Sequence, residues 1–162
     1  MLDLKILLER LLKNEVECVL IGGFAAVVHG SASLTQDLDV CFNFTPENIR
    51  KLLRALESTH PQVRAGGGMK PLGDDVERLA RYKNLYIQTD LGRLDLLGDI
   101  AAIGDYKNVA AHTVSVELFG LACSVLDIAS LVKSKEALGR PKDKEVVLQL
   151  KAIQEKLKNS SL

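Results

Sequence analysis

The chain has no tryptophan, few other aromatic residues and no excess of charge of either sign. Aromatic residues make up 4% of its 162 residues, and 21 lysines and arginines balance 21 aspartates and glutamates. Single-stranded nucleic acids are commonly bound by stacking of their bases on aromatic side chains, so this composition disfavours that class of protein. The zero net charge argues against a generic surface for polyanions, so long nucleic acid is not favoured as a partner, although a local basic patch is compatible with it.

Cysteine is scarce as well, and features that target a chain to a membrane are missing. The cysteines Cys18, Cys41 and Cys123 lie in apolar segments, are odd in number and lack metal-ligand spacing. They are therefore predicted to be buried free thiols in a reducing cytosol. An acid stands near the start, where a signal peptide has basic residues, and no apolar run approaches the ~20 residues of a membrane span. We expect a soluble, cytoplasmic, single-domain protein with no membrane partner.

The spacing of apolar residues predicts that helices and short strands alternate along the chain. Leucines recur at helical spacing within residues 2–14, and Thr45 followed by Pro46 predicts the start of another helix. The glycine-rich segment 60–75, which contains Gly66-Gly67-Gly68, is expected to be a mobile connection. The other elements are expected as helices at 22–30, 46–58, 127–137 and 141–158, strands at 16–21, 37–43, 112–118 and 121–125, and a hairpin over 84–98.

Two aspartates alternate along the strand that is predicted at 37–43. Because side chains alternate across a strand, Asp37 and Asp39 share one face, whereas Leu38 and Val40 point to the other face and into packing. Two carboxylates on one face of an apolar strand are costly unless they hold a cation or join a hydrogen-bond network. Carboxylates are suited to hard cations such as Mg²⁺, which usually also binds substrate phosphates.

A glycine pair, Gly22-Gly23, ends one apolar strand and begins the following helix. Backbone N–H groups at a helix N-terminus can bind anions, so the pair could cradle a phosphate, although a plain strand-to-helix turn explains it equally well. Thr35 could hydrogen-bond to the loop before the aspartates or reach a phosphate. A phosphate cradle beside metal-binding carboxylates indicates phosphoryl or nucleotidyl transfer.

A third aspartate, Asp95, lies within the predicted hairpin between Leu94 and Leu96. On its own it would be interpreted as a solvent-facing residue of an edge strand. Together with Asp37 and Asp39 it favours a different interpretation, because three carboxylates on two neighbouring strands could hold two divalent ions roughly 3.5–4 Å apart. Asp95 is separate from the pair in sequence, so it is the natural candidate to accept a proton from an attacking hydroxyl.

These residues resemble the pattern of the nucleotidyltransferase superfamily that includes DNA polymerase beta. The likeness consists of Gly22-Gly23, then Asp37-x-Asp39, then Asp95 on a later strand. The segment 131–143 is similar to the Lys-x-x-x-x-Arg-x-x-Asp segment of small bacterial and archaeal nucleotidyltransferase-like proteins, some of which are toxins of toxin–antitoxin or phage-defence pairs. The resemblance covers about residues 16–150.

The resemblance implies a fold and a set of residue roles. The expected fold is an α+β nucleotidyltransferase fold, in which a small mixed sheet of three to five strands has helices packed on one face. The core would span residues 1–125, and a helical C-terminal extension would span 126–162. The implied roles are Asp37, Asp39 and Asp95 as catalytic residues and ligands of two Mg²⁺ ions, and Gly22, Gly23, Thr35 and Lys135 as nucleotide-binding residues. Arg140 and Asp143 either pair with each other or cap the last helix, or they contact the substrate.

The implied activity is Mg²⁺-dependent transfer of a nucleoside monophosphate from an NTP to an acceptor hydroxyl, with release of pyrophosphate. The acceptor could be tRNA, a protein side chain or a small molecule, and a partner protein could supply its binding surface. One departure from the pattern is Ser33, which stands where relatives often have an arginine. An alternative is a catalytically silent module that acts by binding another protein, as an antitoxin or regulatory subunit does. A weaker alternative is a Ca²⁺ or Mg²⁺ site without transfer.

Overall fold

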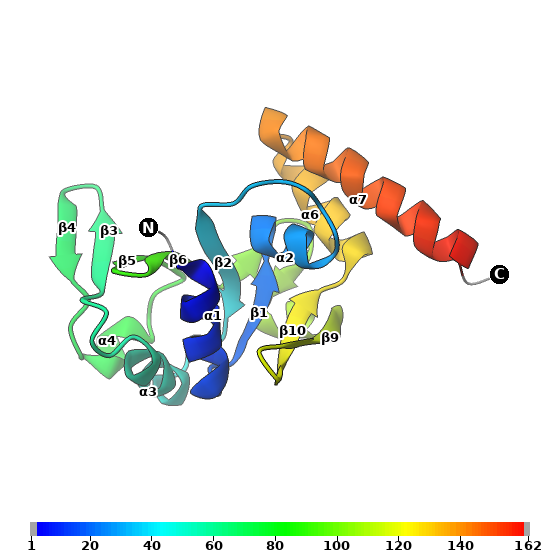
Figure 1. Cartoon of the computed structure of the whole chain (residues 1–162). Coiled ribbons are helices and arrows are strands. Elements are labelled where there is room, and N and C mark those ends of the chain that lie inside the picture. The colour runs from blue at the N-terminus through cyan, green and yellow to red at the C-terminus, as the bar shows by residue number, and fades with distance from the viewer. Residues whose placement is uncertain (1–2, 161–162) are drawn as a thin grey trace.

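An eight-stranded mixed sheet organises the chain, and the computed structural model describes residues 3–160 of it (Figure 1). Across this sheet the strands follow the order β4-β3-β5-β6-β2-β1-β10-β9. Their bounds are β1 Cys18–Ile21, β2 Asp37–Phe42, β3 Gln62–Ala65, β4 Gly68–Pro71, β5 Asn84–Thr89, β6 Gly92–Leu97, β9 Thr113–Leu118 and β10 Leu121–Leu126. A two-stranded sheet is formed by β7 (Asp99–Ile100) and β8 (Gly104–Asp105).

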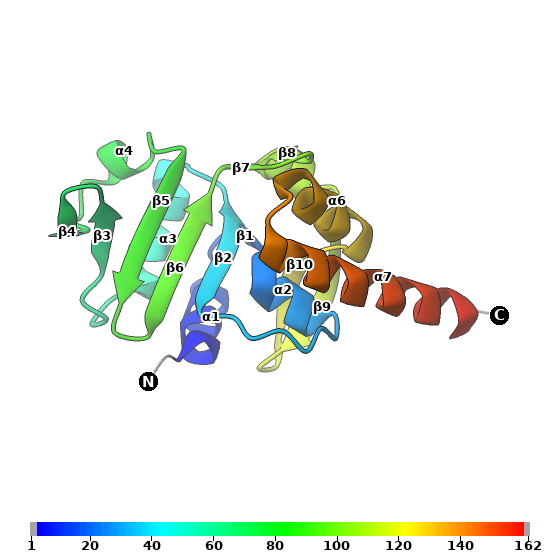
Figure 2. The same ribbon diagram turned by 90° about the horizontal axis from the view of Figure 1, so that it is seen from above.

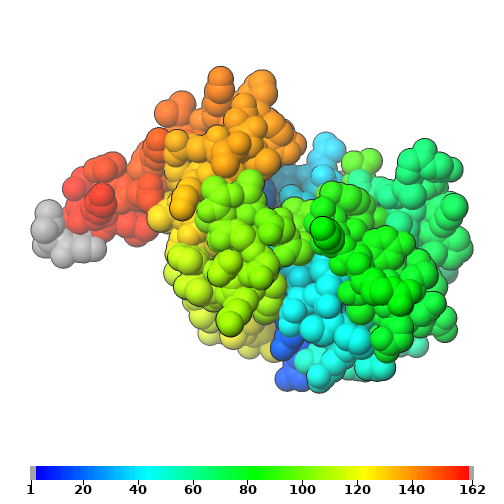
Figure 3. Space-filling model, turned by 180° about the vertical axis from the view of Figure 1, so that it is seen from behind, coloured from blue at the N-terminus to red at the C-terminus, as the bar shows by residue number. Residues whose placement is uncertain are grey.

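The helices connect these strands and lie on both sides of the sheet. Their bounds are α1 Leu4–Lys13, α2 Gly22–Val28, α3 Pro46–Ala55, α4 Val76–Leu79, α5 Tyr106–Ala110, α6 Ile128–Leu138 and α7 Pro141–Ser160. Helices α1 and α3 lie below the sheet in Figure 1, whereas α6 and α7 lie on its upper side. In the view from above, α3 lies behind strands β5 and β6, whereas α7 lies in front of the sheet, on its β1–β10 side (Figure 2). The last turns of α7 project from the body of the molecule (Figure 3).

This architecture confirms the α+β class, a mixed sheet and a helical C-terminal segment, but corrects the size of the sheet and the placement of the helices. The sheet in the described part of the chain has eight strands, not three to five, and is unlike the small sheet of the nucleotidyltransferase fold. Packing of helices on one face only was also wrong. Strands β3 and β4 were not expected: they pair antiparallel at one sheet edge, within the segment 60–75, which was expected to be a loop. At the other edge, β9 pairs with β10, and both lie close to strands expected from the sequence.

Other elements lie close to the positions expected from the sequence. The hairpin of β5 and β6 is formed as predicted over 84–98. The first helix begins at Leu4 rather than at residue 2, which lies outside the described residues. All three cysteines are free, and Cys41 and Cys123 are buried. Within residues 3–160, no helix combines the length and the apolar character that crossing a membrane requires.

The hydrophobic core determines which face of the sheet carries the aspartates. In β2, Leu38 and Val40 are fully buried, and in β6 the same holds for Leu94 and Leu96. Helix α1 contacts both strands as well as α3. Because neighbouring residues on a strand point to opposite faces, burial of these leucines and Val40 directs the intervening aspartates to the face that α1 and α3 leave free.

A buried amide holds α3 against the ends of two central strands. Thr45 caps the helix by accepting a hydrogen bond from the backbone of Asn48 at 3.2 Å. The Asn48 side chain accepts from the Glu17 backbone N–H at 2.7 Å and donates to the backbone carbonyls of Glu17 and Asn43, both at 2.9 Å. Glu17 precedes β1 and Asn43 follows β2, so this one side chain closes the β1–β2 ladder.

We expect Asn48→Ala to lower the free energy of unfolding by about 2–4 kcal/mol, because buried backbone groups lose their partners. Urea denaturation followed by circular dichroism measures this loss. Asn84→Ala is a matched control, since its side chain accepts one exposed hydrogen bond, from Gly98 N–H at 3.2 Å. That control is expected to cost less than about 1 kcal/mol. Equal losses in the two variants would contradict the role given to Asn48.

Candidate functional site

Three aspartates gather on the sheet face opposite the helices α1 and α3. Strands β2 and β6 run parallel, with Asp39 directly opposite Asp95 and Asp37 opposite Arg93. One carboxylate oxygen from each of Asp37, Asp39 and Asp95 lies within 4.8 Å of the other two. The side chains that were singled out in the sequence are therefore brought together by the register of one strand pair. We call these three residues the acidic triad.

The triad is electrostatically unfavourable when it holds no cation. Burial raises the pKa of Asp39 to about 6, and the neighbouring charges of Asp95 and Asp37 act in the same direction, against the influence of Lys135. Burial also raises the pKa of Asp95, while Arg64 works in the opposite direction. Asp39 and Asp95 share a side-chain hydrogen bond. Carboxyl groups that are forced together in this way retain protons that a bound cation would displace.

The donor set of the triad fits a hard divalent cation. Oδ1 of Asp37 is buried and has no hydrogen-bond donor among the described residues. The nearest basic group to it is Nη1 of Arg93 at 3.9 Å, beyond hydrogen-bond distance. A buried oxygen without a donor beside two further carboxylates offers oxygen ligands of the kind that Mg²⁺ binds.

Gly22 and Gly23 lie at the start of α2, directly against the triad and the loop before it. A Cβ atom on Gly22 would lie 2.5 Å from Oδ2 of Asp39, and the residue has a φ of +66°. A Cβ atom on Gly23 would lie 3.0 Å from Oγ1 of Thr35. Thr35 in turn donates a hydrogen bond to the backbone carbonyl of Asp37 at 2.9 Å. These contacts show that the glycines make room for the site; binding of phosphate by Gly22, Gly23 or Thr35 stays a prediction.

Basic residues from α6 and the loop after it face the triad across a cleft. Lys135 is 6% exposed, and burial lowers its pKa against the influence of Asp143, whose Oδ1 lies 3.8 Å from Nζ. Arg140 donates to both oxygens of Asp143, at 2.6 and 3.1 Å, so these two residues do pair; contact of either with a substrate stays a prediction. Lys135, Arg140, Asp39 and Asp95 all line a cleft of about 400 Å³.

One residue that sequence reasoning missed is Arg64 of β3, which forms an ion pair with Asp95. The segment around it was expected to be a loop, so its side chain could not be placed. Arg64 thus places a positive charge near the triad, which the sequence around Ser33 does not provide. Ser33 itself lies within hydrogen-bond distance of Ser31 and Gln149, the latter on α7. The apolar Val63 just before Arg64, which packs against the core, is a weak signal of a strand in that segment.

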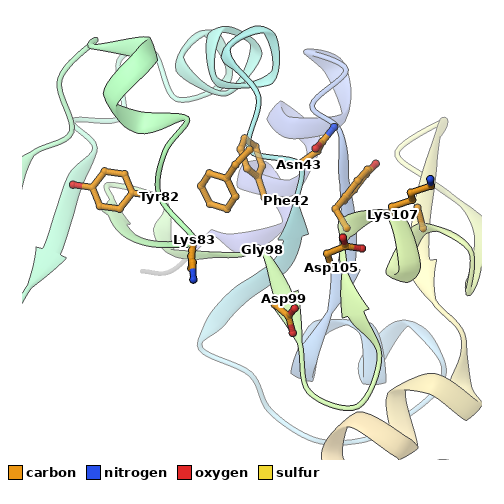
Figure 4. A pocket seen from close by; sticks show the side chains of 11 residues that line it. Phe42, Asn43, Tyr82, Lys83, Gly98, Asp99, Asp105 and Lys107 are labelled. Atoms are coloured by element: carbon orange, nitrogen blue, oxygen red, sulfur yellow. The ribbon is translucent and has the colours of Figure 1, made fainter.

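A second hollow lies apart from the triad, at the far ends of β2 and β6 (Figure 4). It measures about 850 Å³, and none of its lining residues was singled out from the sequence. Its wall contains Asp99 and Asp105, which face each other across β7 and β8, but also Lys83 and Lys107. This mixed lining selects no single ligand chemistry, so the triad cleft is the stronger candidate site. Asp99 borders both spaces.

In comparisons with known proteins, no protein-family model and no curated protein matches the chain.

Gly22→Ala tests whether the glycine makes room for the Asp39 carboxylate. We expect it to lower the free energy of unfolding by about 1–3 kcal/mol, because the new Cβ meets an oxygen and the positive φ is strained. Gly120→Ala is the matched control, because Gly120 has a similar φ of +73° but a Cβ there meets nothing within 4 Å. Chemical denaturation of both variants measures the difference. If Gly120→Ala is as damaging as Gly22→Ala, close packing against Asp39 is not the cause.

The raised pKa of Asp39 predicts that stability falls with pH when no metal is present. A carboxyl group whose pKa is near 6 in the folded protein, above its usual 3.8, stabilises the fold fully below about pH 4. That contribution is lost as pH rises through 6. In EDTA at pH 7.5, we expect Asp39→Asn to be more stable than wild type by about 1–2 kcal/mol, with the difference vanishing near pH 4. Thermal unfolding across this pH range measures it, with exposed Asp74→Asn as control; a pH-independent difference would contradict the charge origin.

Proposed function

We propose that this chain is a Mg²⁺-dependent nucleotidyltransferase, which moves a nucleoside monophosphate from an NTP to an acceptor hydroxyl and releases pyrophosphate. The observation that carries the proposal is the in-register pairing of β2 with β6, which gathers Asp37, Asp39 and Asp95 and leaves a buried oxygen of Asp37 without a donor. The sequence pattern from Gly22-Gly23 to the triad supports this type of transfer. The proposal rests on the side chains and not on the fold, since the wide sheet differs from the small one expected.

The triad would hold the metal. Bound Mg²⁺ would neutralise charge on the triphosphate and make the acceptor hydroxyl more acidic. Asp95 is the natural candidate to accept the proton of that hydroxyl, because it lies beside Asp39 on the neighbouring strand and apart from the Asp37–Asp39 pair in sequence. Gly22 keeps the Asp39 carboxylate in place by leaving its space unfilled.

Lys135 and Arg140 would attract the phosphates of the NTP into the triad cleft. The ammonium of Lys135 lies 3.8 Å from the Asp143 carboxylate, too far for a direct hydrogen bond, so its donors are available to an anion. Arg140 is held by Asp143 and contributes its charge at the border of the cleft. Zero net charge of the whole chain does not favour a long nucleic acid, so a small molecule, a protein side chain or a tRNA end remain the acceptor classes.

Binding of nucleotide and metal is the first test. At about a hundredfold excess over its dissociation constant, an NTP should stabilise the folded protein by about 2.7 kcal/mol and raise its melting temperature by roughly 5–10 °C. We expect this shift with Mg²⁺ and one or more NTPs for the wild type and for Asp74→Asn, and its loss in EDTA and in Asp37→Asn. Differential scanning fluorimetry with each NTP measures it.

The type of transfer is tested with NTP labelled at either the α- or the γ-phosphate. Nucleotidyl transfer to an acceptor retains the α-label and releases the γ-label in pyrophosphate, whereas transfer of the terminal phosphate retains the γ-label instead. Total tRNA, protein extract and small-molecule extract serve as separate acceptor pools. Absence of any Mg²⁺–NTP shift would overturn the enzyme proposal and favour the alternative, a module that binds a partner protein.

A further inference from the structure

A row of four side chains crosses the sheet through the acidic triad. Tyr86 of β5 lies opposite Asp95 of β6, which lies opposite Asp39 of β2. On the other side of Tyr86, Val63 of β3 pairs with Ile87, so the next residue, Arg64, continues the row. Residues that are paired across strands project to the same face, so Arg64 and the triad share one surface of the sheet.

Arg64 reaches across the Tyr86 ring to the triad. The guanidinium carbon lies 5.8 Å from the centre of the Tyr86 ring, and the guanidinium forms an ion pair with Oδ1 of Asp95. Nε of Arg64 is buried and has no acceptor within the described part of the chain. The guanidinium therefore holds a positive charge against the triad while one of its donors is unused. A planar group with several donors in a fork is well matched to phosphate oxygens.

We propose that Arg64 is a phosphate-binding residue that neutralises the triad in the metal-free protein and contacts the triphosphate once a divalent cation binds there. This inference rests on the proposed function. Asp95, which accepts from Arg64, would also be a ligand of the metal, and a divalent ion repels a guanidinium at close range. The triphosphate that accompanies Mg²⁺ offers the displaced guanidinium new acceptors.

Arg64 lies near an exposed edge of the sheet. Its backbone lies one residue past the last pair between β3 and β5, that of Val63 with Ile87, and pairs with Met69 of β4. Beyond β3, strand β4 is exposed along its whole length. The Tyr86 ring supports the guanidinium and can support it after a rotation of the side chain, because attraction to the face of a ring is weakly directional. Lys135 faces the same carboxylates from α6, so cations would flank the triphosphate on two sides.

Titration calorimetry on the whole chain tests the exchange with two probes, Mg²⁺ alone and Mg²⁺ with inorganic tripolyphosphate. For Arg64→Gln we expect opposite changes: Mg²⁺ alone binds about threefold or more tightly, because a competing cation is gone, and tripolyphosphate binds about tenfold or more weakly. Arg64→Lys keeps the charge, so it should recover part of the affinity for tripolyphosphate.

Arg78→Gln is the matched control, since Arg78 also lies over a tyrosine ring, that of Tyr82 at 6.0 Å, and is near an aspartate, Asp75. It should change neither affinity, and melting temperatures verify that every variant is folded. Tighter Mg²⁺ binding by Arg64→Gln with unchanged tripolyphosphate binding would overturn the inference, because Arg64 would then be a counter-ion only. Failure of the wild type to bind Mg²⁺ with tripolyphosphate would instead remove the proposed function on which the inference rests.

Discussion

The parallel pairing of β2 with β6 is the constraint on which the rest of the site depends. It places Asp39 beside Asp95 on one face while Leu38, Val40, Leu94 and Leu96 fill the core on the other. A shift of the register by one residue would turn the carboxylates toward α1 and the leucines toward the cleft, which burial of the leucines forbids. The stability of the core thus enforces an arrangement of like charges that the carboxylates themselves disfavour.

The cationic groups around the triad relieve this repulsion only in part. Arg64 pairs with Asp95, Arg93 lies 3.9 Å from Asp37, and Lys135 acts to lower the pKa of Asp39. The pKa of Asp39 is nevertheless raised, and an oxygen of Asp37 has no donor. A site of purely structural ion pairs would be expected to satisfy its buried oxygens, so the remaining imbalance is what would favour binding of a further cation.

The three aspartates could be predicted to lie together because the alternation of polar and apolar residues that indicates it is a local, periodic pattern. Alternation of Asp37 and Asp39 with Leu38 and Val40 indicates a strand with one buried face, and Asp95 repeats the same pattern within a hairpin. The number of strands in the sheet could not be predicted from local patterns, because the pairing of β1 with β10 joins residues about a hundred positions apart, Leu20 and Val125. Strands β3 and β4 were missed because they are mostly exposed at an edge and therefore lack alternation.

These missed edge strands alter how the departure at Ser33 is to be interpreted. A sequence motif is defined by residues at fixed spacings, so a missing arginine at one position counts against phosphate binding. In the folded chain, residues distant in sequence can lie close together, and β3 brings Arg64, about thirty residues downstream of Ser33, to the triad. Arg64 thus places a positive charge beside the triad at a position that the pattern around Ser33 did not indicate. The constellation of side chains, not the sheet, is the level at which the chemistry of this chain is specified.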